Sequence, residues 1–253
     1  MIVRSDTRLS AHLHGSPNIE PRRGGARPDI LLLHYTGMLS GAKAIAWLAD
    51  PRSRVSCHYV VDEDGAITQM VAEDMRAWHA GVGAWEGVGD VNSRSIGIEI
   101  HNPGHDLGYP DYPAAQMRAV TALCRDIIAR QGIAAHRVLA HSDIAPDRKK
   151  DPGEKFDWAG LARAGVGHWV APGKVVGEAT EPCVEPDAPL IAHAQRLLSD
   201  YGYGIAVSGA MDEATRKVVI AFQRHFRPAR VDGRLDGSTI DTLERLMAAR
   251  SGA

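Results

Sequence analysis

The chain has 253 residues, of which 44% are hydrophobic and 24% charged, and its 29 basic residues nearly balance its 31 acidic ones. This length predicts two domains, a larger one with a substantial core and a smaller module. A formal net charge of -2, with no run of lysine and arginine among aromatics, argues against nucleic acid or an anionic membrane surface as a partner. No window is apolar enough to span a bilayer.

The cysteines and the N-terminal segment bear on the compartment. Cys57, Cys124 and Cys183 are far apart and odd in number, so no disulfide framework is expected and a reducing compartment is compatible. The segment Met1–Gly25 has charges and prolines but no apolar core of signal-peptide length, and no lipid-attachment cysteine lies near the start. These features predict a cytoplasmic protein, with the periplasm or cell envelope as the alternative.

Four short apolar segments have the lengths and borders of strands. They are residues 30–33, 59–62, 96–100 and 138–140, and the second resumes at Ile67 after a turn. In the third segment, isoleucines alternate with Gly97, Glu99 and His101, which predicts a strand with one polar face. Helical spacing of apolar residues occurs at 42–49 and more strongly at 117–128, with Gly132 as a stop. Strands mixed with helices predict an α/β core.

A linker divides the chain into two parts. The segment Val170–Pro189 contains four prolines and two glycines and has no amphipathic period. The predicted domains are therefore a catalytic domain over 1–169, a linker over 170–188 and a small domain over 189–253.

The small domain has three helical patterns, which lie at residues 190–201, 215–226 and 240–247. They predict a three-helix bundle. A unit of the form Gly-x-apolar-Asp-x-x-Thr occurs at 209–215 and again at 233–239. This repeat predicts two similarly built helix starts, each with an Asp or Thr side chain that caps exposed amides.

Three potential metal ligands lie at or just beyond predicted strand ends, and they are His34, His141 and Asp151. Two imidazoles and a carboxylate from separate rigid elements would hold a tetrahedral zinc ion and leave its fourth position to water. Bound zinc lowers the pKa of that water from about 16 toward about 7 and polarises an amide carbonyl. The sequence therefore predicts one open, catalytic zinc site in each chain.

Two further side chains are candidates for the chemistry around such an ion. Glu99, on the polar face of its strand, is the candidate to take the proton of the water and pass it to the leaving amine. A salt-bridged structural carboxylate is the alternative for this residue. Lys149 is the candidate to stabilise the developing oxyanion, and a solvated loop charge is the alternative there.

Four segments together carry a family pattern. They are His34-Tyr-Thr, Cys57-His58-Tyr with Asp64-Gly65, Ser95-Ile-Gly-Ile-Glu99-Ile, and His141-Ser-Asp-Ile-Ala-Pro-x-Arg-Lys-x-Asp151-Pro-Gly. This pattern resembles the zinc-dependent N-acetylmuramoyl-L-alanine amidases of the AmpD/AmiD type over roughly residues 28 to 160. The last segment is the most specific, because Lys149 and Asp151 follow His141 by eight and ten residues, the spacing of that family.

The resemblance implies a mixed central β-sheet flanked by helices and the hydrolysis of the amide between N-acetylmuramic acid and L-alanine. It also implies a role for each matched residue: zinc ligands His34, His141 and Asp151, general base Glu99, and transition-state stabiliser Lys149. Lys150 falls outside the register of the family. Asp147 stands where the family usually has glycine, which bears on loop flexibility or substrate fit more than on metal binding.

The small domain is similar to the peptidoglycan-binding domain that often accompanies wall hydrolases. The matching features are Ala194-Gln-Arg-Leu-Leu, Tyr201-Gly-Tyr, Gly209-x-Met-Asp-x-x-Thr215, Phe222-Gln-Arg and Val231-Asp-Gly. The aromatic residues Tyr201, Tyr203 and Phe222 suit either the core of the bundle or a glycan surface, so no binding residue is assigned in this domain.

Other residues near the motifs have two interpretations. Trp78 and His79 lie in a glycine-flanked loop that is suited to a sugar or peptide groove, and packing is the alternative. His79 could also be mistaken for a fourth metal ligand. For His58 and Tyr59 we expect core packing, and for Cys57 a buried, inert thiol, because the CxxC spacing of a structural zinc site is absent.

Three functions compete at this point. The first is amide hydrolysis on peptidoglycan or muropeptides. The second is a non-catalytic peptidoglycan receptor on the same scaffold, which is disfavoured because the three ligands, Glu99 and Lys149 are all present. The third is a zinc peptidase that acts within the stem peptide. Whether the substrate is an anhydro-muropeptide or the polymeric wall stays open.

Overall fold

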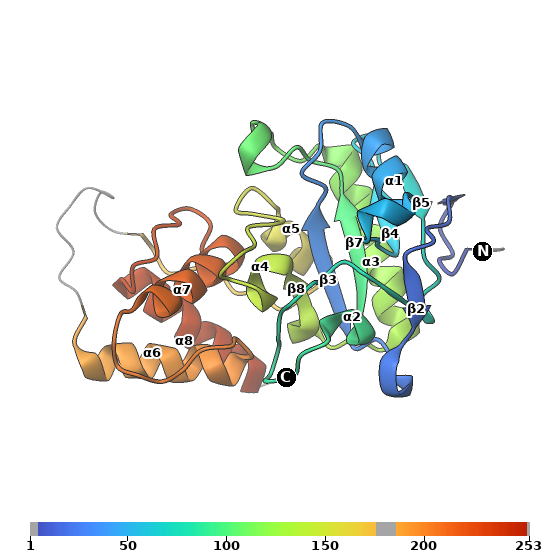
Figure 1. The fold of residues 1–253 in the computed structure, drawn as a ribbon. Coiled ribbons are helices and arrows are strands. Elements are labelled where there is room, and N and C mark those ends of the chain that lie inside the picture. The colour runs from blue at the N-terminus through green and yellow to red at the C-terminus, as the bar shows by residue number, and fades with distance from the viewer. Residues whose placement is uncertain (1–4, 176–185, 252–253) are drawn as a thin grey trace.

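The computed structural model describes residues 5–175 and 186–251. Its centre is a six-stranded sheet with the order β1-β5-β4-β7-β3-β8 (Figure 1). The strands are β1 (His12–Leu13), β3 (Ile30–Tyr35), β4 (Tyr59–Val61), β5 (Ile67–Gln69), β7 (Ser95–Ile100) and β8 (Val138–Ala140). Strands β4, β7, β3 and β8 run parallel, whereas β5 is antiparallel to β4. The predicted mixed sheet is therefore confirmed.

The remaining elements of the first domain are mostly short. Strands β2 (Ile19–Pro21) and β6 (Met75–Ala77) form a separate antiparallel pair. The helices are α1 (Gly41–Leu48), α2 (Val91–Arg94), α3 (Ala114–Gln131), α4 (His141–Ile144) and α5 (Trp158–Arg163), with 3-10 turns η1 (Arg23–Gly25), η2 (Pro51–Ser53), η3 (His105–Leu107) and η4 (Ala135–Arg137). The sequence predicted α1 and α3 but not α2, α4 or α5, because elements of four to six residues show no clear period.

Helix α3 covers one face of the sheet and ends where predicted. Its residues Val120, Leu123 and Ile127 are buried in one cluster with residues of β3 and β7. At its C-terminus Gly132 has φ 70°, and its N–H donates to the carbonyl of Ile128. A left-handed residue after the last turn is favourable for glycine, which is why the helix stops there.

Strand β7 has the predicted polar face, and most of that face is covered by other side chains. Ile96, Ile98 and Ile100 face the α3 side. On the other face a Cβ at Gly97 would lie 2.5 Å from the ring of His79, so only glycine leaves room for that ring. His101 is also buried. Gly97 and His101 are therefore interior residues, whereas Glu99 is only partly buried.

The predicted three-helix bundle is confirmed, and its helices are α6 (Ala188–Tyr201), α7 (Glu213–Phe226) and α8 (Gly237–Ser251). The repeated unit caps two of these helices in the same way. Asp212 accepts a hydrogen bond from the N–H of Thr215 (2.7 Å), and Asp236 accepts one from the N–H of Thr239 (2.8 Å). The side chains of Tyr201, Tyr203 and Phe222 are buried, which assigns them to the core.

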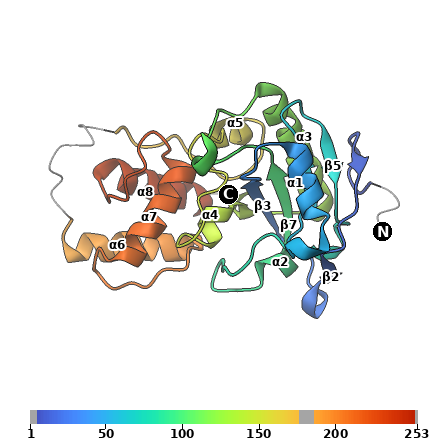
Figure 2. The same cartoon turned by 45° about the horizontal axis from the view of Figure 1, so that its top comes forward.

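The bundle packs directly on the first domain. Trp85 and Ile144 of the first domain share one buried cluster with Tyr203, Phe222 and other bundle residues. Helix α4 lies between the sheet and α7 in both views (Figures 1 and 2). Of the predicted linker, residues 176–185, with Cys183, lie outside the described residues. The domain limits stay a prediction.

Candidate active site

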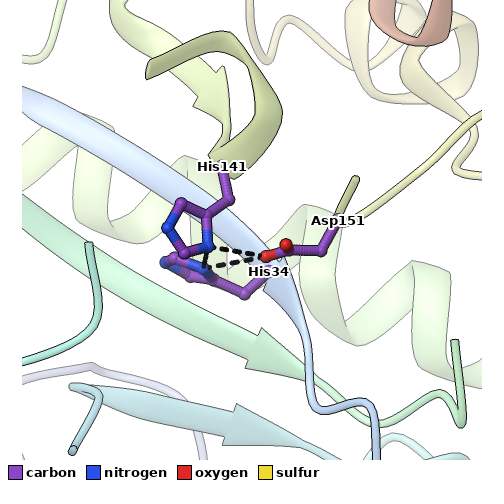
Figure 3. A group of neighbouring side chains, drawn as sticks. All are labelled: His34, His141 and Asp151. Carbon is purple, nitrogen blue, oxygen red and sulfur yellow. Dashed lines mark hydrogen bonds and ion pairs between the residues drawn. The ribbon is translucent and has the colours of Figure 1, made fainter. Parts of the chain in front are cut away.

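The three predicted ligands come together at the carboxyl ends of the parallel strands. His34 lies on β3, His141 follows β8 directly, and Asp151 lies in the loop after α4. The distances are 2.8 Å between His34 Nδ1 and His141 Nδ1, 3.1 Å from His34 Nδ1 to Asp151 Oδ2, and 2.8 Å from His141 Nδ1 to the same oxygen (Figure 3). All three residues are buried. Three donor atoms thus converge on one point.

Hydrogen bonds on the far side of each ring show which nitrogen faces this point. His141 Nε2 lies 2.9 Å from the carbonyl of Ala80, which can only accept, so Nε2 carries the proton. The hydroxyl of Ser95 donates to the carbonyl of Val91 (2.7 Å). Its oxygen is therefore left to accept from His79 Nε2, at 3.3 Å.

The same chain of bonds continues to His34. With its proton on Nε2, His79 accepts at Nδ1 from His34 Nε2, at 3.0 Å. Both His34 and His141 then present an unprotonated Nδ1 to the carboxylate of Asp151. Three lone pairs that face one another in a buried site repel unless a cation lies between them, and two imidazoles with a carboxylate suit zinc. The residues present therefore fit a zinc ion.

The protonation states agree with this arrangement. The pKa of His34 is lowered to about 4, mainly by burial and to a smaller extent by the neighbouring His141. The ring is therefore neutral at pH 7. Burial alone would raise the pKa of Asp151, but its interaction with the two imidazole rings, His141 first, keeps that pKa well below its usual value, so the carboxyl is ionised. Neutral imidazole and ionised carboxylate are the forms that bind a metal.

Glu99 is placed beside the ligands by strand register. His34 and Glu99 are paired across β3 and β7, so their side chains leave the same face of the sheet. The Oε2 atom of Glu99 is buried and has no hydrogen-bond partner among the described residues. Burial, followed by the negative charge of Asp151, raises the pKa of Glu99 well above its ordinary value. The carboxyl is therefore available to a substrate or a water.

The two lysines of the last motif separate as predicted. Lys149 lines the pocket that contains Glu99, His141 and Asp151. Lys150 instead points to Asp106, 3.9 Å away at the surface. The register of the motif therefore selected the lysine that reaches the site.

His34, His141 and Asp151 are called the triad below. A pocket of about 280 Å³ opens next to it. It is lined by Tyr35, Thr36, Gly37, Met38, Ala44, Trp47, Leu48, Val55, Ser56, Trp78, His79, Glu99, His141, Lys149 and Asp151. Helix α1 and residues near it supply apolar lining residues, and the charged ones are Glu99, Lys149 and Asp151. The indole Nε1 of Trp78 is buried without a partner among the described residues. The ring nitrogens of His79 contact His34 and Ser95, which the sequence did not predict.

The neighbouring motif residues have structural roles, as expected. His58 Nδ1 accepts from the N–H of Gly97 (3.0 Å), and its Nε2 lies 3.1 Å from the carbonyl of Met75. The hydroxyl of Tyr59 donates to Glu73 (2.7 Å), and Cys57 is buried. This segment holds β4 and β7 together beneath the site.

His58 should make the stability of the metal-free protein depend on pH. Burial, followed by the charge of Arg22, lowers its pKa to about 3 from an ordinary 6.5. As the pH falls through 6.5, His58 binds a proton in the unfolded chain but not in the folded chain. Its contribution to the free energy of unfolding is therefore present above pH 6.5 and is lost as the pH falls toward 3. Between pH 7 and pH 5 this loss is about 2 kcal/mol.

Urea unfolding at the two pH values measures this effect. The variant His58→Gln should show a smaller fall in the free energy of unfolding from pH 7 to pH 5 than the unaltered protein. An equal fall in both proteins would mean that His58 is not held neutral by the fold.

The comparisons with known proteins agree with the site. Residues 24–154 match the family model described as N-acetylmuramoyl-L-alanine amidase. The chain is 37% identical to the N-acetylmuramoyl-L-alanine amidase AmiD of Escherichia coli over 237 residues, which is 87% of this chain and 83% of AmiD. The chain belongs to the N-acetylmuramoyl-L-alanine amidase family.

Solved structures extend the likeness of this amidase to both domains. AmiD from E. coli in complex with anhydro-N-acetylmuramic acid-L-Ala-D-gamma-Glu-L-Lys is similar with a TM-score of 0.75 and 34% identity, over 91% of this chain and 92% of that one. AmpDh3 from Pseudomonas aeruginosa in complex with an anhydromuramic pentapeptide has a TM-score of 0.74 and 31% identity, over 99% of both chains.

The second domain of the amidase is matched separately. Residues 187–243 match a peptidoglycan binding domain family, which confirms the prediction for the bundle. In the part of the chain that the structure describes, no helix combines the length and apolarity that crossing a membrane requires.

Proposed function

We propose that this amidase uses a zinc-activated water to hydrolyse the amide between the lactyl group of N-acetylmuramic acid and the first L-alanine of a stem peptide. The observation that carries the proposal is the convergence of two unprotonated Nδ1 atoms and one carboxylate oxygen beside the unpartnered carboxyl of Glu99. A receptor on the same scaffold would need neither the donor set nor this carboxyl.

His34, His141 and Asp151 would hold the ion. When bound there, zinc supplies a Lewis acid for the amide carbonyl and lowers the pKa of a water in its open position. The proton transfers and the stabilisation of the oxyanion are assigned to side chains that line the pocket.

Glu99 moves the proton in this reaction. It takes a proton from the water as the oxygen bonds to the carbonyl carbon, and it delivers that proton to the nitrogen of L-alanine as the C–N bond breaks. The raised pKa of Glu99 suits the first transfer, because a carboxylate with a higher pKa is a stronger base toward water, and the greater basicity of the leaving amine drives the second. Its neighbour Lys149 places an ammonium group near the carbonyl oxygen as negative charge develops there.

The pocket walls would orient the substrate. Trp78 offers an unpartnered indole N–H for a carbonyl or hydroxyl of the muropeptide. His79 acts mainly on His34, whose ring it orients. The ligands of AmiD and AmpDh3 in their solved structures are anhydro-muropeptides, which supports the same substrate class here. The bundle would hold peptidoglycan, as its family match indicates.

Mass spectrometry of digests tests the bond that is cut. A defined anhydro-muropeptide should give anhydro-N-acetylmuramic acid with a free lactyl carboxyl and a peptide with a free L-alanine amino terminus. Purified peptidoglycan should release intact stem peptides. Digestion of both substrates in parallel shows which one is preferred. Fragments cut within the stem peptide would instead identify a zinc peptidase and contradict the proposal.

A further inference from the structure

A buried carboxylate lies two residues after the ligand His141. Asp143 belongs to the single turn α4, and its side chain is fully buried. Its Oδ2 accepts from the N–H of Ala140 at 2.8 Å. This bond closes the first turn of the helix and fixes the backbone on which His141 is carried.

The other two partners of Asp143 come from the bundle. The hydroxyl of Tyr203 donates to Oδ1 at 2.7 Å, and His225 Nδ1 donates to Oδ2 at 2.7 Å. Both donors are buried. The ring of His225 is stacked between Trp158 of the first domain (3.7 Å between centroids) and Phe226 (3.8 Å), so its direction is set by packing.

The same segment is connected to another ligand. The N–H of Ser142 donates to the backbone carbonyl of Asp151 at 3.1 Å. A displacement of α4 would therefore move both His141 and the chain that carries Asp151. The bundle is thus linked to the backbone that carries His141 and Asp151 through hydrogen bonds to Asp143.

We propose that the bundle is a positioning element of the metal centre, in which Tyr203 and His225 hold Asp143 and thereby keep His141 directed at the ion. This inference rests on the proposed zinc site. Tyr203 and His225 are positioning residues, since neither lines the pocket over the triad. The bundle would then contribute to metal binding as well as to attachment to the wall.

The physical reason is the cost of an underpaired buried charge. A carboxylate without water needs several donors, and two of the three that Asp143 has are side chains of the bundle. Without them the segment gains stability by shifting until the carboxylate reaches water. Loss of a direct hydrogen-bond partner of a metal ligand weakens metal binding by about 10- to 100-fold, and since Asp143 acts through the backbone that carries His141, we expect the lower end of this range.

A second contact of α7 reaches the far side of the pocket. Arg224 lies 3.6 Å from Glu154, Glu154 lies 3.2 Å from His105, and His105 Nδ1 lies 3.0 Å from the hydroxyl of Tyr35. Tyr35 lines the pocket next to His34. Helix α7 is therefore connected to the site by two separate chains of contacts.

The test compares two substitutions that each remove one tyrosine hydroxyl in the full chain. Tyr203→Phe removes a donor to Asp143. Tyr201→Phe is the matched control, because Tyr201 is buried in the same cluster but its hydroxyl contacts His168, at 3.0 Å. The zinc dissociation constant is measured by competition with a chelator. We expect Tyr203→Phe to raise it about tenfold and Tyr201→Phe to leave it unchanged.

Hydrogen exchange of the metal-free proteins gives a second readout that does not require zinc. The amides of residues 140–145 should exchange faster in Tyr203→Phe than in Tyr201→Phe or the unaltered chain. If Tyr203→Phe does not fold, His225→Phe replaces it, since that ring keeps the stacking but cannot donate to Asp143. Binding to purified peptidoglycan should be the same in all folded variants.

The outcomes separate this inference from the proposed function. If the unaltered chain binds no zinc, the metal centre is refuted, and the exchange rates alone decide whether the bundle braces α4. If it binds zinc and the Tyr203 and Tyr201 variants share its dissociation constant and exchange rates, the bracing role is refuted while the metal centre stands.

Discussion

Replacement of Glu99 by glutamine is expected to leave zinc bound and to lower kcat by about 10²- to 10⁴-fold, the contribution of a general acid–base residue. Glutamine keeps the size of the side chain but cannot take a proton from water. The zinc content of the purified variant and its turnover of a muropeptide check both parts. A variant that keeps its activity would exclude Glu99 as the base.

The stability of the same variant controls for misfolding. Because the fold raises the pKa of Glu99 above its ordinary 4.5, it favours the protonated carboxyl. That contribution is fully present below about pH 4.5 and is lost as the pH rises through the raised value. In the metal-free state at pH 8, Glu99→Gln should therefore be at least as stable as the unaltered amidase. A marked loss of stability at pH 8 would contradict the raised pKa assigned to this carboxyl.

Replacement of Asp151 by alanine is expected to remove both bound zinc and activity. The change deletes one of three donors and leaves two Nδ1 lone pairs without the charge that balances the ion. The zinc affinity should fall by more than the roughly 10- to 100-fold that follows loss of an outer partner. Elemental analysis after dialysis against a weak chelator measures this loss.

Asp147 provides the matched control for that experiment. It is an exposed carboxylate on the same loop, four residues before Asp151, and it does not line the pocket over the triad. Asp147→Ala should keep zinc and most of the activity. Full zinc retention in Asp151→Ala would show that this carboxylate is not a ligand.

Much of the site could be predicted because strand ends gather in one place. His34 and His141 each follow an apolar segment, and the carboxyl ends of parallel strands meet at one edge of a sheet. The register of the resembling family distinguished Lys149 from Lys150, and the structure places Lys149 in the pocket and Lys150 near Asp106 at the surface. The cytoplasmic location expected from the N-terminal segment stays a prediction.

Other features could not be predicted because they depend on pairs distant in sequence. The alternation in β7 predicted a polar face, but it did not show that the ring of His79 packs against that face at Gly97. His79 was a candidate for the groove, and its contact with His34 spans 45 residues. Sequence periodicity shows that a residue lies on one face of a strand but not what covers it.

The sequence by itself nominated the residues proposed to carry the chemistry: two histidines, an aspartate, a glutamate and a lysine on or just beyond predicted strands. The strand patterns place these residues and the resemblance to the amidase family implies their roles, because both depend on the order of residues along the chain. Only the tertiary structure decided which nitrogen of each histidine faces the proposed metal site, through the carbonyl of Ala80 and the ring of His79. It alone also joined the bundle to Asp143, because such contacts form only when distant segments pack together.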